Sequence, residues 1–400
     1  MPRNGLGTYS LPAGQPVVSG TTISSSTFNT LTSDLATALT QSLCIDGQAV
    51  PTANLPMGGY KLTGLANGSA SADSATYGQV TSLIAADRKM YNRIINGDMR
   101  IDQRLEGAGL TLTAGAALAF PIDRWYAYCQ GANVSAARIA GAGNTQYRLQ
   151  LGGAAGVTGI GVGQRIEQAD CYDLAGQTVT LSATLANVLL PTVTWAAYYA
   201  NSTNAFGTVA SPTRTLISNG TFTVTGSHVR YSASFAVPAA ATTGIEIVFT
   251  VGAQISNSLI ISEVQLELGS AASTFERRAF ADELIRCQRF YQKSYNAGTA
   301  QGSSTTVGQA VGRQGSATTL LDSLTSRLSP SMFSTPTQIF FWSPNTGTIN
   351  RVRDITGAAD VTVSGVSYEG ANSTGYPTAS AAVTANNQLA AHWIAVAEIP

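Results

Sequence analysis

The chain has 400 residues, too many for one small domain, and its 22 Lys and Arg balance its 22 Asp and Glu to give a net charge of +0. Charged residues make up only 11% of the chain, whereas a hydrophobic fraction of 44% suffices for packed cores, so the composition argues against disorder throughout. A neutral chain also lacks the clustered basic charge that binders of nucleic acids or of anionic membranes need, and we expect neither partner.

Four widely separated cysteines, Cys44, Cys129, Cys171 and Cys287, form no C-x-x-C pair, and only two histidines accompany them. This spacing predicts neither a zinc site nor a disulfide framework, so we expect free thiols and no metal or cofactor. No apolar run is long enough to cross a bilayer, and the first twenty residues hold no signal-like apolar stretch. We therefore expect synthesis in a cytoplasm, without membrane insertion.

Residues 1–21 are rich in glycine and proline, which prevents long regular elements and predicts an extended arm. Apolar residues then recur at steps of three and four, which indicates one amphipathic helix. A helix with so thin a stripe is not stable alone, and we expect it to trimerise, since such a stripe is well buried around a threefold axis. The alternative is that it packs on a downstream domain of the same chain. The predicted trimerisation residues are Ile23, Phe28, Leu31, Leu35 and Leu39.

The next segment contains Gly58-Gly-Tyr-Lys-Leu-Thr-Gly-Leu65 and, after a small-residue spacer, Asp73-Ser-Ala-Thr-Tyr-Gly-Gln-Val80. Its glycines predict turns around one or two short strands anchored by Tyr60, Leu62 and Leu65. Asp73 or Ser74 is expected to cap a helix that runs to about Lys89.

These two strings resemble the repeated module of tailed-bacteriophage tail fibre proteins, and Gly7-Thr-Tyr-Ser-Leu-Pro-Ala-Gly14 is similar to their virion-attachment arm. The resemblance covers residues 1 to about 85. It implies that residues 1–90 dock to phage tail or neck proteins, and that the protein is located in the virion.

From residue 91 to about 275, apolar residues alternate in steps of two, as in Val193, Trp195 and Ala197, or Ile245, Ile247 and Phe249. This period predicts many half-buried strands separated by turns, and favours an antiparallel β-sandwich of the jelly-roll type.

Five further strings in this region occur in an order that resembles the carbohydrate-binding-module-like jelly rolls of phage fibres. The resemblance implies a sugar-binding ancestry, with bacterial surface polysaccharide as the partner. The strings begin at Asn96, Asp123, Gln164, Leu174 and Val264.

Aromatic rings are the groups on which such folds stack sugars. Alternation along each strand places Trp125 opposite Tyr126 and Tyr128, and places Trp195 with Tyr199 opposite Tyr198, so about half of these rings are expected to lie in the core. The predicted carbohydrate-binding residues are Trp125, Tyr126, Tyr128, Trp195, Tyr198, Tyr199 and Trp342.

Residues 276–295 show helical spacing, with Phe280, Leu284, Cys287 and Tyr291 on one face. We expect a linking helix whose Arg and Glu residues are solvated or pair between chains. Strand-like segments follow to the end of the sequence and predict a small β domain over 296–400, similar to the tip domain of fibre proteins. Its aromatic residues are Trp342, Tyr368, Tyr376, His392 and Trp393.

A polysaccharide-cleaving enzyme would need two carboxylates at a fixed separation, and six acidic residues are near enough in sequence to consider: Asp98, Asp102, Asp123, Glu167, Asp170 and Asp173. We expect them to cap turns or to pair with Arg104, Arg124 and Arg165 instead. The string Gly159-Ile-Gly-Val-Gly163 imitates a nucleotide-binding loop, but Arg165 and a strand-like continuation replace the third glycine and its helix. We therefore expect no enzyme.

The sequence thus predicts a mainly β, elongated multi-domain fibre with short N-terminal helices, a jelly-roll sandwich, a linking helix and a small C-terminal β domain. The predicted parts are an arm (1–21), a neck and shaft segment (22–90), the sandwich (91–275), the helix (276–295) and the tip (296–400). The function this favours is that of a phage tail fibre that contacts host glycan. The alternatives are a structural collar or decoration fibre without glycan binding, and a glycan-degrading tailspike.

Overall fold

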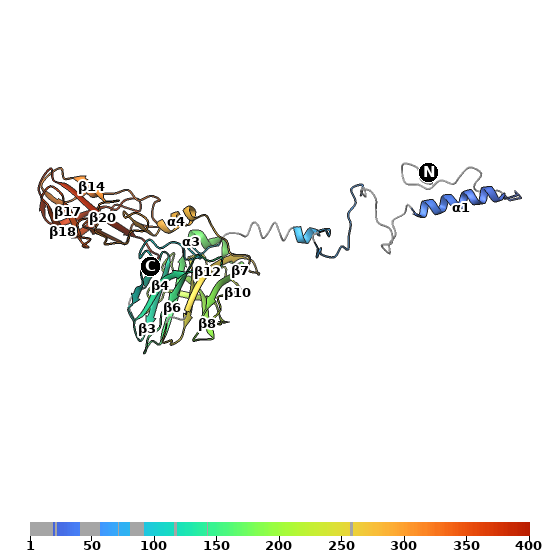
Figure 1. Ribbon diagram of the computed structural model, residues 1–400, viewed down its shortest axis with the longest axis horizontal. Coiled ribbons are helices and arrows are strands. Elements are labelled where there is room, and N and C mark those ends of the chain that lie inside the picture. Colours follow the sequence, from blue (N-terminus) through green and yellow to red (C-terminus); the bar gives the residue numbers. More distant parts are fainter. Residues whose placement is uncertain are drawn as a thin grey trace. The chain divides into compact units, whose positions relative to one another are not determined.

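A computed structural model describes residues 19–20, 22–40, 57–70, 72–80, 92–115, 118–141, 143–256 and 259–400 (Figure 1). The chain divides into two compact units, Met1–Gln79 and Val80–Pro400, and each is considered by itself. The predicted arm, apart from residues 19 and 20, and Cys44 lie outside the described residues. Within the described ranges, no helix combines the length and the apolar character that a bilayer crossing requires.

The first unit contains the predicted amphipathic helix, α1 (Ser25–Thr40). Ser24 caps it, because its hydroxyl accepts a hydrogen bond of 3.2 Å from the backbone N–H of Thr27. The predicted stripe lies open: Leu39 is 70% exposed and Phe28 55% exposed, Ile23 and Leu35 are exposed, and Leu31 is half-buried. The helix is confirmed, and its trimerisation stays a prediction.

The segment over 57–70 contains no strand, so the prediction of short strands there is wrong. The helical turn that follows begins at Tyr77, and Thr76 caps it. The Thr76 hydroxyl accepts a hydrogen bond of 3.2 Å from the backbone N–H of Gln79, and the Gln79 side-chain oxygen accepts one of 3.0 Å from the backbone N–H of Thr76. This reciprocal pair is a capping box. Asp73 instead closes a turn by accepting from Ser69 and Ala70, and the rest of the predicted helix lies outside the described residues.

In the second unit, two antiparallel six-stranded sheets form the predicted sandwich (Figure 1). Their orders are β1-β4-β5-β12-β7-β10 and β2-β3-β6-β11-β8-β9. The strands are β1 (Leu110–Leu112), β2 (Ala119–Ile122), β3 (Trp125–Gln130), β4 (Val134–Ala140), β5 (Tyr147–Leu151), β6 (Gly159–Ile166), β7 (Thr178–Ala186), β8 (Thr192–Ala200), β9 (Arg214–Thr223), β10 (Val229–Ala236), β11 (Ile245–Val251) and β12 (Leu259–Leu268).

The apolar side chains that alternate along these strands meet between the two sheets, as the period of two predicts. Trp125, Val162 and Phe249 from one sheet, and Leu181 and Leu266 from the other, are fully buried in a single core. Short helical segments α3 (Gln168–Cys171) and η1 (Tyr172–Leu174) lie between β6 and β7. The mainly β, jelly-roll prediction is therefore confirmed.

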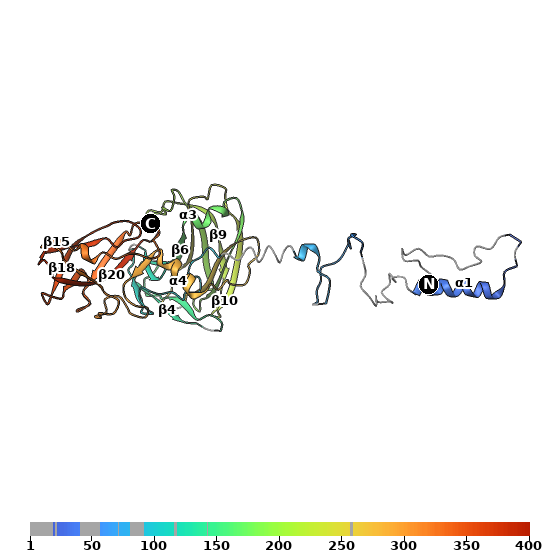
Figure 2. The same cartoon turned by 90° about the horizontal axis from the view of Figure 1, so that it is seen from above.

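The remaining strands form a second β domain around β20, which pairs with β13, β14, β16 and β17 (Figures 1 and 2). Leu389, Ala391 and Trp393 of β20 are buried, so the C-terminal segment is a core strand as expected. The elements are β13 (Tyr291–Lys293), β14 (Ala310–Arg313), β15 (Thr318–Leu320), η2 (Asp322–Leu324), β16 (Gln338–Trp342), β17 (Arg351–Asp354), β18 (Ala359–Ser367), β19 (Tyr376–Val383) and β20 (Gln388–Val396).

The linking helix is shorter than predicted: α4 spans Phe280–Gln288, and Tyr291 already belongs to strand β13. Cys287 is buried as expected, but Phe280 is 56% exposed, so the predicted apolar face is only partly covered. Pairing with β20, about a hundred residues further along the chain, ends the helix, and helical spacing within 276–295 carries no signal of that distant partner.

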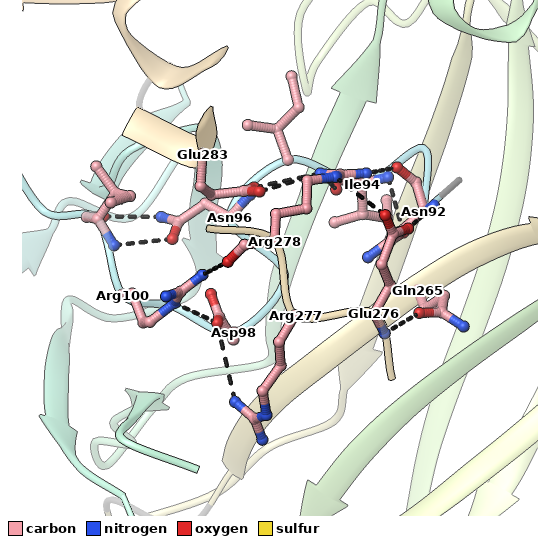
Figure 3. A network of polar contacts seen from close by, with 12 residues as sticks. Asn92, Ile94, Asn96, Asp98, Arg100, Gln265, Glu276, Arg277, Arg278 and Glu283 are labelled. Carbon is pink, nitrogen blue, oxygen red and sulfur yellow. Dashed lines mark hydrogen bonds and ion pairs between the residues drawn. The ribbon is translucent and has the colours of Figure 1, made fainter. Parts of the chain in front are cut away.

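Residues 92–100 and 276–283, almost two hundred residues apart in the sequence, meet in one polar network (Figure 3). Arg278 donates to the carbonyl of Ile94 at 3.0 Å and to the carboxylate of Glu283 at 3.1 Å, and Arg100 donates to the Arg278 carbonyl at 2.8 Å. Arg278 and Glu283 are both largely buried, so the expectation that these charges are solvated or interchain is wrong.

The sandwich and the second β domain are also joined at Glu398, whose carboxylate pairs with Arg104 and Arg124. Arg124 is 2% exposed, and its guanidinium lies 3.4 Å above the ring of Phe290. Burial lowers the pKa of Arg124, and the charge of Glu398 opposes that change. A single acidic residue from the second β domain thus pairs with two arginines of the sandwich.

Candidate functional site

The seven predicted aromatic residues fall into three environments. Trp125 and Trp195 lie in the sandwich core at 0% and 4% exposure, and Tyr199 packs against that core. Trp342 is buried in the second β domain beside Tyr291. Trp125, Trp195 and Trp342 are therefore removed from the set of candidate sugar contacts, because a buried ring cannot stack on a ligand. Tyr199 is half-buried, and its ring packs against the core.

The other three, Tyr126, Tyr128 and Tyr198, lie on the outer face of the β2-β3-β6-β11-β8-β9 sheet, as the alternation predicts. Tyr128 and Tyr198 are half-buried, whereas Tyr126 is 2% exposed. The rings of Tyr126 and Tyr128 are stacked, with centroids 6.5 Å apart and an angle of 23° between their planes. Only two of the seven predicted rings are thus both on this face and partly open.

Glycines on the neighbouring strand explain why these two rings lie flat on the sheet. In the register of β3 and β6, Tyr126 is opposite Gly163 and Tyr128 is opposite Gly161. A Cβ atom on either glycine would overlap the facing tyrosine ring. Because Gly161 and Gly163 have no side chains, the backbone there is open to a flat ring, and the two tyrosine rings cover it. We call this stretch of backbone the flat seat of the two rings.

Charged groups lie beside the rings. Glu246 of β11, which is fully buried, accepts from the Tyr126 hydroxyl at 2.8 Å and from Arg165 at 2.8 Å, and it also pairs with Arg214. Arg214 lies 4.1 Å above the ring of Tyr198. We call Phe120, Tyr126, Tyr128, Tyr198, Arg214 and Glu246 the tyrosine face; Phe120 meets Tyr126 edge-on.

Burial acts on the pKa values of two phenols and one guanidinium of this face. It raises the pKa of Tyr126 well above its ordinary value, with Glu246 adding to the effect, and it also raises the pKa of Tyr128. Burial would lower the pKa of Arg214, but Glu246 outweighs this and raises it. The face therefore offers two partly open apolar rings, hydroxyl donors and a permanent cation, which suit the C–H faces and hydroxyls of a sugar.

Glu246, Gly161 and Gly163 belong to this site, although the sequence patterns did not predict them as site residues. A signal existed for Glu246, because it is the one acidic residue within the apolar alternation of Ile245, Ile247 and Phe249. The glycines imitate a nucleotide loop in sequence. They lie in strand β6, so rejecting a nucleotide loop was correct, and their spacing of two matches that of Tyr126 and Tyr128.

Most of the six acidic residues considered for catalysis are engaged in ion pairs. Four of them pair with arginines: Asp98 with Arg100, Asp102 with Arg138, Glu167 with Arg289 and Asp173 with Arg93. We expected these acids to pair with Arg104, Arg124 and Arg165. That expectation is wrong, because Arg104 and Arg124 pair with Glu398, and Arg165 pairs with Glu246. The backbone carbonyl of Asp170 accepts from Arg93.

Asp123 is fully buried and accepts from the backbone and the side chain of Gln103, at 2.6 and 3.0 Å. Burial raises its pKa from 3.8 to about 6, although Arg104 and Gln103 oppose the change. The folded protein therefore holds this proton more tightly than the unfolded chain. Below pH 3.8, Asp123 is protonated in both states and its ionisation does not change the free energy of unfolding. As the pH rises from 3.8 toward 6, its ionisation in the unfolded chain lowers the free energy of unfolding.

We therefore expect Asp123→Asn to gain stability relative to the wild type as the pH rises from 3.8 to 6, by about 3 kcal/mol in total. The measurement is the free energy of unfolding in urea for both proteins at several pH values. Carboxylates common to both proteins cancel in the difference. A difference that does not change with pH would contradict the assignment.

The second β domain buries most of its predicted tip aromatics. His392 is fully buried and stacks on Tyr295 at 3.8 Å, and Trp393 is 8% exposed. Tyr376 is half-buried, and Tyr368 is the open ring, at 48% exposure. Among the residues described, no three His, Cys, Asp or Glu side chains are grouped so as to hold a metal ion.

No protein-family model matches the chain, and no curated protein matches it. Solved structures do match. A CBM4 carbohydrate-binding module is 12% identical over 44% of this chain and 98% of its own, with a TM-score of 0.27. A CBM22-1 xylan-binding domain from Paenibacillus barcinonensis is 13% identical over 42% of this chain and 99% of its own, with a TM-score of 0.24.

The enzymatically active domain of tailspike protein 4 from bacteriophage CBA120 is also similar, at 16% identity and a TM-score of 0.27. That match covers 44% of this chain but only 21% of the tailspike chain.

Proposed function

We propose that the protein is a tail fibre of a tailed bacteriophage and that its tyrosine face binds a glycan of the host surface. The observation that supports glycan binding is the pair of partly open rings, Tyr128 and Tyr198, held on one sheet face beside Arg214. One ring stacks on the apolar face of a sugar, and the guanidinium donates to its oxygens. Each contact is modest, so useful affinity requires several copies of the site.

Two sequence features support the fibre part of the proposal. The strings Gly58–Leu65 and Asp73–Val80 resemble the module of tail fibre proteins, and helix α1 carries an apolar stripe that stays exposed in the single chain. Burying that stripe between copies would stabilise the helix and bring several tyrosine faces together. The proposed assembly is a trimer in the virion, attached through residues 1–90.

Light scattering of the full-length protein tests this assembly. We expect the mass of three chains at micromolar concentration, and a lower mass for Leu35→Glu, because a charge in the stripe opposes burial. Thr37→Glu is the matched control, since Thr37 is exposed on the same helix but lies off the stripe. A wild-type protein that remains monomeric at this concentration would contradict the assembly.

An array of envelope and capsule polysaccharides tests glycan binding. We expect the full-length protein to bind, and we expect Tyr128→Ala and Tyr198→Ala each to weaken binding by about tenfold or more. Tyr172→Ala is the control, because Tyr172 is 60% exposed in the same domain but outside the tyrosine face. No binding on any array would favour the structural collar or decoration fibre, and release of reducing sugar from a polysaccharide would favour the tailspike.

A further inference from the structure

A pocket lies on the outer face of the sheet that does not carry the tyrosine face, β1-β4-β5-β12-β7-β10. Its volume is about 690 Å³, within the range of sites for small ligands. Side chains from β7, β10 and β12 and from the segment after β12 line it, and most of them are polar. We call it the hydroxyl pocket, and its principal residues are Thr145, Thr184, Arg230, Ser232, Glu263 and Arg277.

Glu263 occupies an unusual backbone conformation at this pocket. It lies at a bulge in β12, between Ser262 and Gln265, and has a φ of 49°, in the left-handed region that non-glycine residues seldom adopt. Its carboxylate accepts hydrogen bonds of 3.0 Å from both Thr145 and Thr184, and it also pairs with Arg277. Both of its oxygens are therefore occupied, and its charge is neutralised.

Arg230 is different, because it forms no ion pair with any residue in the described parts of the chain. Its two terminal nitrogens donate to the backbone carbonyl of Glu263 at 3.0 Å and to the hydroxyl of Ser182 at 2.6 Å, and each keeps a second N–H. The side chain is half-buried in the pocket lining. Among the described residues no carboxylate is in direct contact with this guanidinium, although Glu263 and Glu267 act on its charge from a greater distance.

The charged groups that line the pocket have a net positive charge. Arg277 is shared between Glu263 and, at 3.9 Å, Asp98, and Figure 3 shows it directed toward Asp98 and away from the Arg278 network. Burial lowers the pKa of His228, with Arg148 adding to the effect, so His228 adds no charge at neutral pH. Two guanidinium groups and one carboxylate thus give the lining a net charge of about +1.

We infer that the hydroxyl pocket is a second saccharide site, for a sugar unit that carries a carboxylate, such as a uronic acid. The carboxylate binds the unpaired N–H groups of Arg230, and the ring hydroxyls bind Ser232 and the polar segment around Ser273 and Thr274. A neutral sugar would leave the charge of Arg230 unpaired. This site is separate from the tyrosine face, since the two lie on the outer faces of different sheets.

Calorimetric titration of the full-length protein with digalacturonate, and with the neutral galactose disaccharide of the same linkage, tests this inference. We expect binding of digalacturonate in the millimolar range or tighter, and binding of the neutral disaccharide at least about tenfold weaker. Ser232→Phe should reduce digalacturonate binding at least about tenfold, because a phenyl ring there fills the pocket. Ser232 is exposed, and its side chain makes no hydrogen bond to any residue that the structure describes, so the substitution removes no internal contact. Arg230→Met should do the same by removing the cation.

Two control variants show whether digalacturonate binds in this pocket or elsewhere on the protein. Thr223→Phe places the same ring at an exposed position of β9, in the other sheet, and should leave digalacturonate binding unchanged. Tyr128→Ala should also leave digalacturonate binding unchanged, because Tyr128 belongs to the tyrosine face and not to the hydroxyl pocket. The test of this pocket is therefore independent of the test of the tyrosine face. The inference is overturned if the wild type does not bind digalacturonate at millimolar concentration, or if Tyr128→Ala abolishes binding that Ser232→Phe retains.

Discussion

Replacing Glu398 by alanine is expected to lower the free energy of unfolding by about 3 to 5 kcal/mol, because it removes the carboxylate that pairs directly with two buried arginines. Arg104 and Arg124 both pair with this carboxylate, and their side chains are only 11% and 2% exposed. The effect should therefore far exceed the 0 to about 1 kcal/mol typical of ion pairs at the surface.

Urea unfolding at neutral pH measures this effect. Glu369→Ala is the matched control, because its carboxylate makes an exposed hydrogen bond to Ser373, and it should change stability by less than about 0.5 kcal/mol. Since Glu398 joins the second β domain to the sandwich, the variant should also unfold in two separable steps. A loss below about 1 kcal/mol would mean that the arginines find other partners or water.

Substituting Gly161 by alanine is expected to reduce glycan binding by about tenfold or more, although every tyrosine remains in place. The new methyl group would overlap the ring of Tyr128, which must then leave its position on the sheet. The loss would show that the position of the ring, and not merely its presence, makes the site. Array binding or titration with the preferred glycan measures it.

Gly252→Ala is the control for this substitution. Gly252 is an exposed residue of the same domain, and a Cβ atom there would meet nothing within 4 Å. We expect this variant to bind glycan as the wild type does. If Gly161→Ala folds normally and binds with unchanged affinity, the flat seat of Tyr128 has no part in recognition.

Features that depend on near neighbours in the sequence were predictable. The period of three and four indicates helix α1, and the period of two assigns Trp125 and Tyr126 to opposite faces of β3, which the structure confirms. A period fixes which side of an element a residue occupies. It does not fix how deeply that side is covered, which is why the sequence predicts Tyr126 as a sugar contact although it is only 2% exposed.

Features that depend on distant partners were not predictable. The end of α4 is set by the pairing of β13 with β20, and the partners of Arg104 and Arg124 come from the far end of the chain. The flat seat of Tyr128 was not predictable either, because strand register decides that Tyr128 of β3 faces Gly161 of β6. In a β fold, the strand order and register decide which charged residues become neighbours, and a single sequence does not reveal either.

The central claim is that the outer face of the β2-β3-β6-β11-β8-β9 sheet is the glycan-binding surface. A crystal structure of the full-length protein soaked with the oligosaccharide that binds best on the array tests it most directly. We expect a sugar ring stacked on Tyr128 or Tyr198, with an oxygen within hydrogen-bonding distance of Arg214. A sugar bound instead at the open Tyr368 of the second β domain, with the tyrosine face empty, would contradict it.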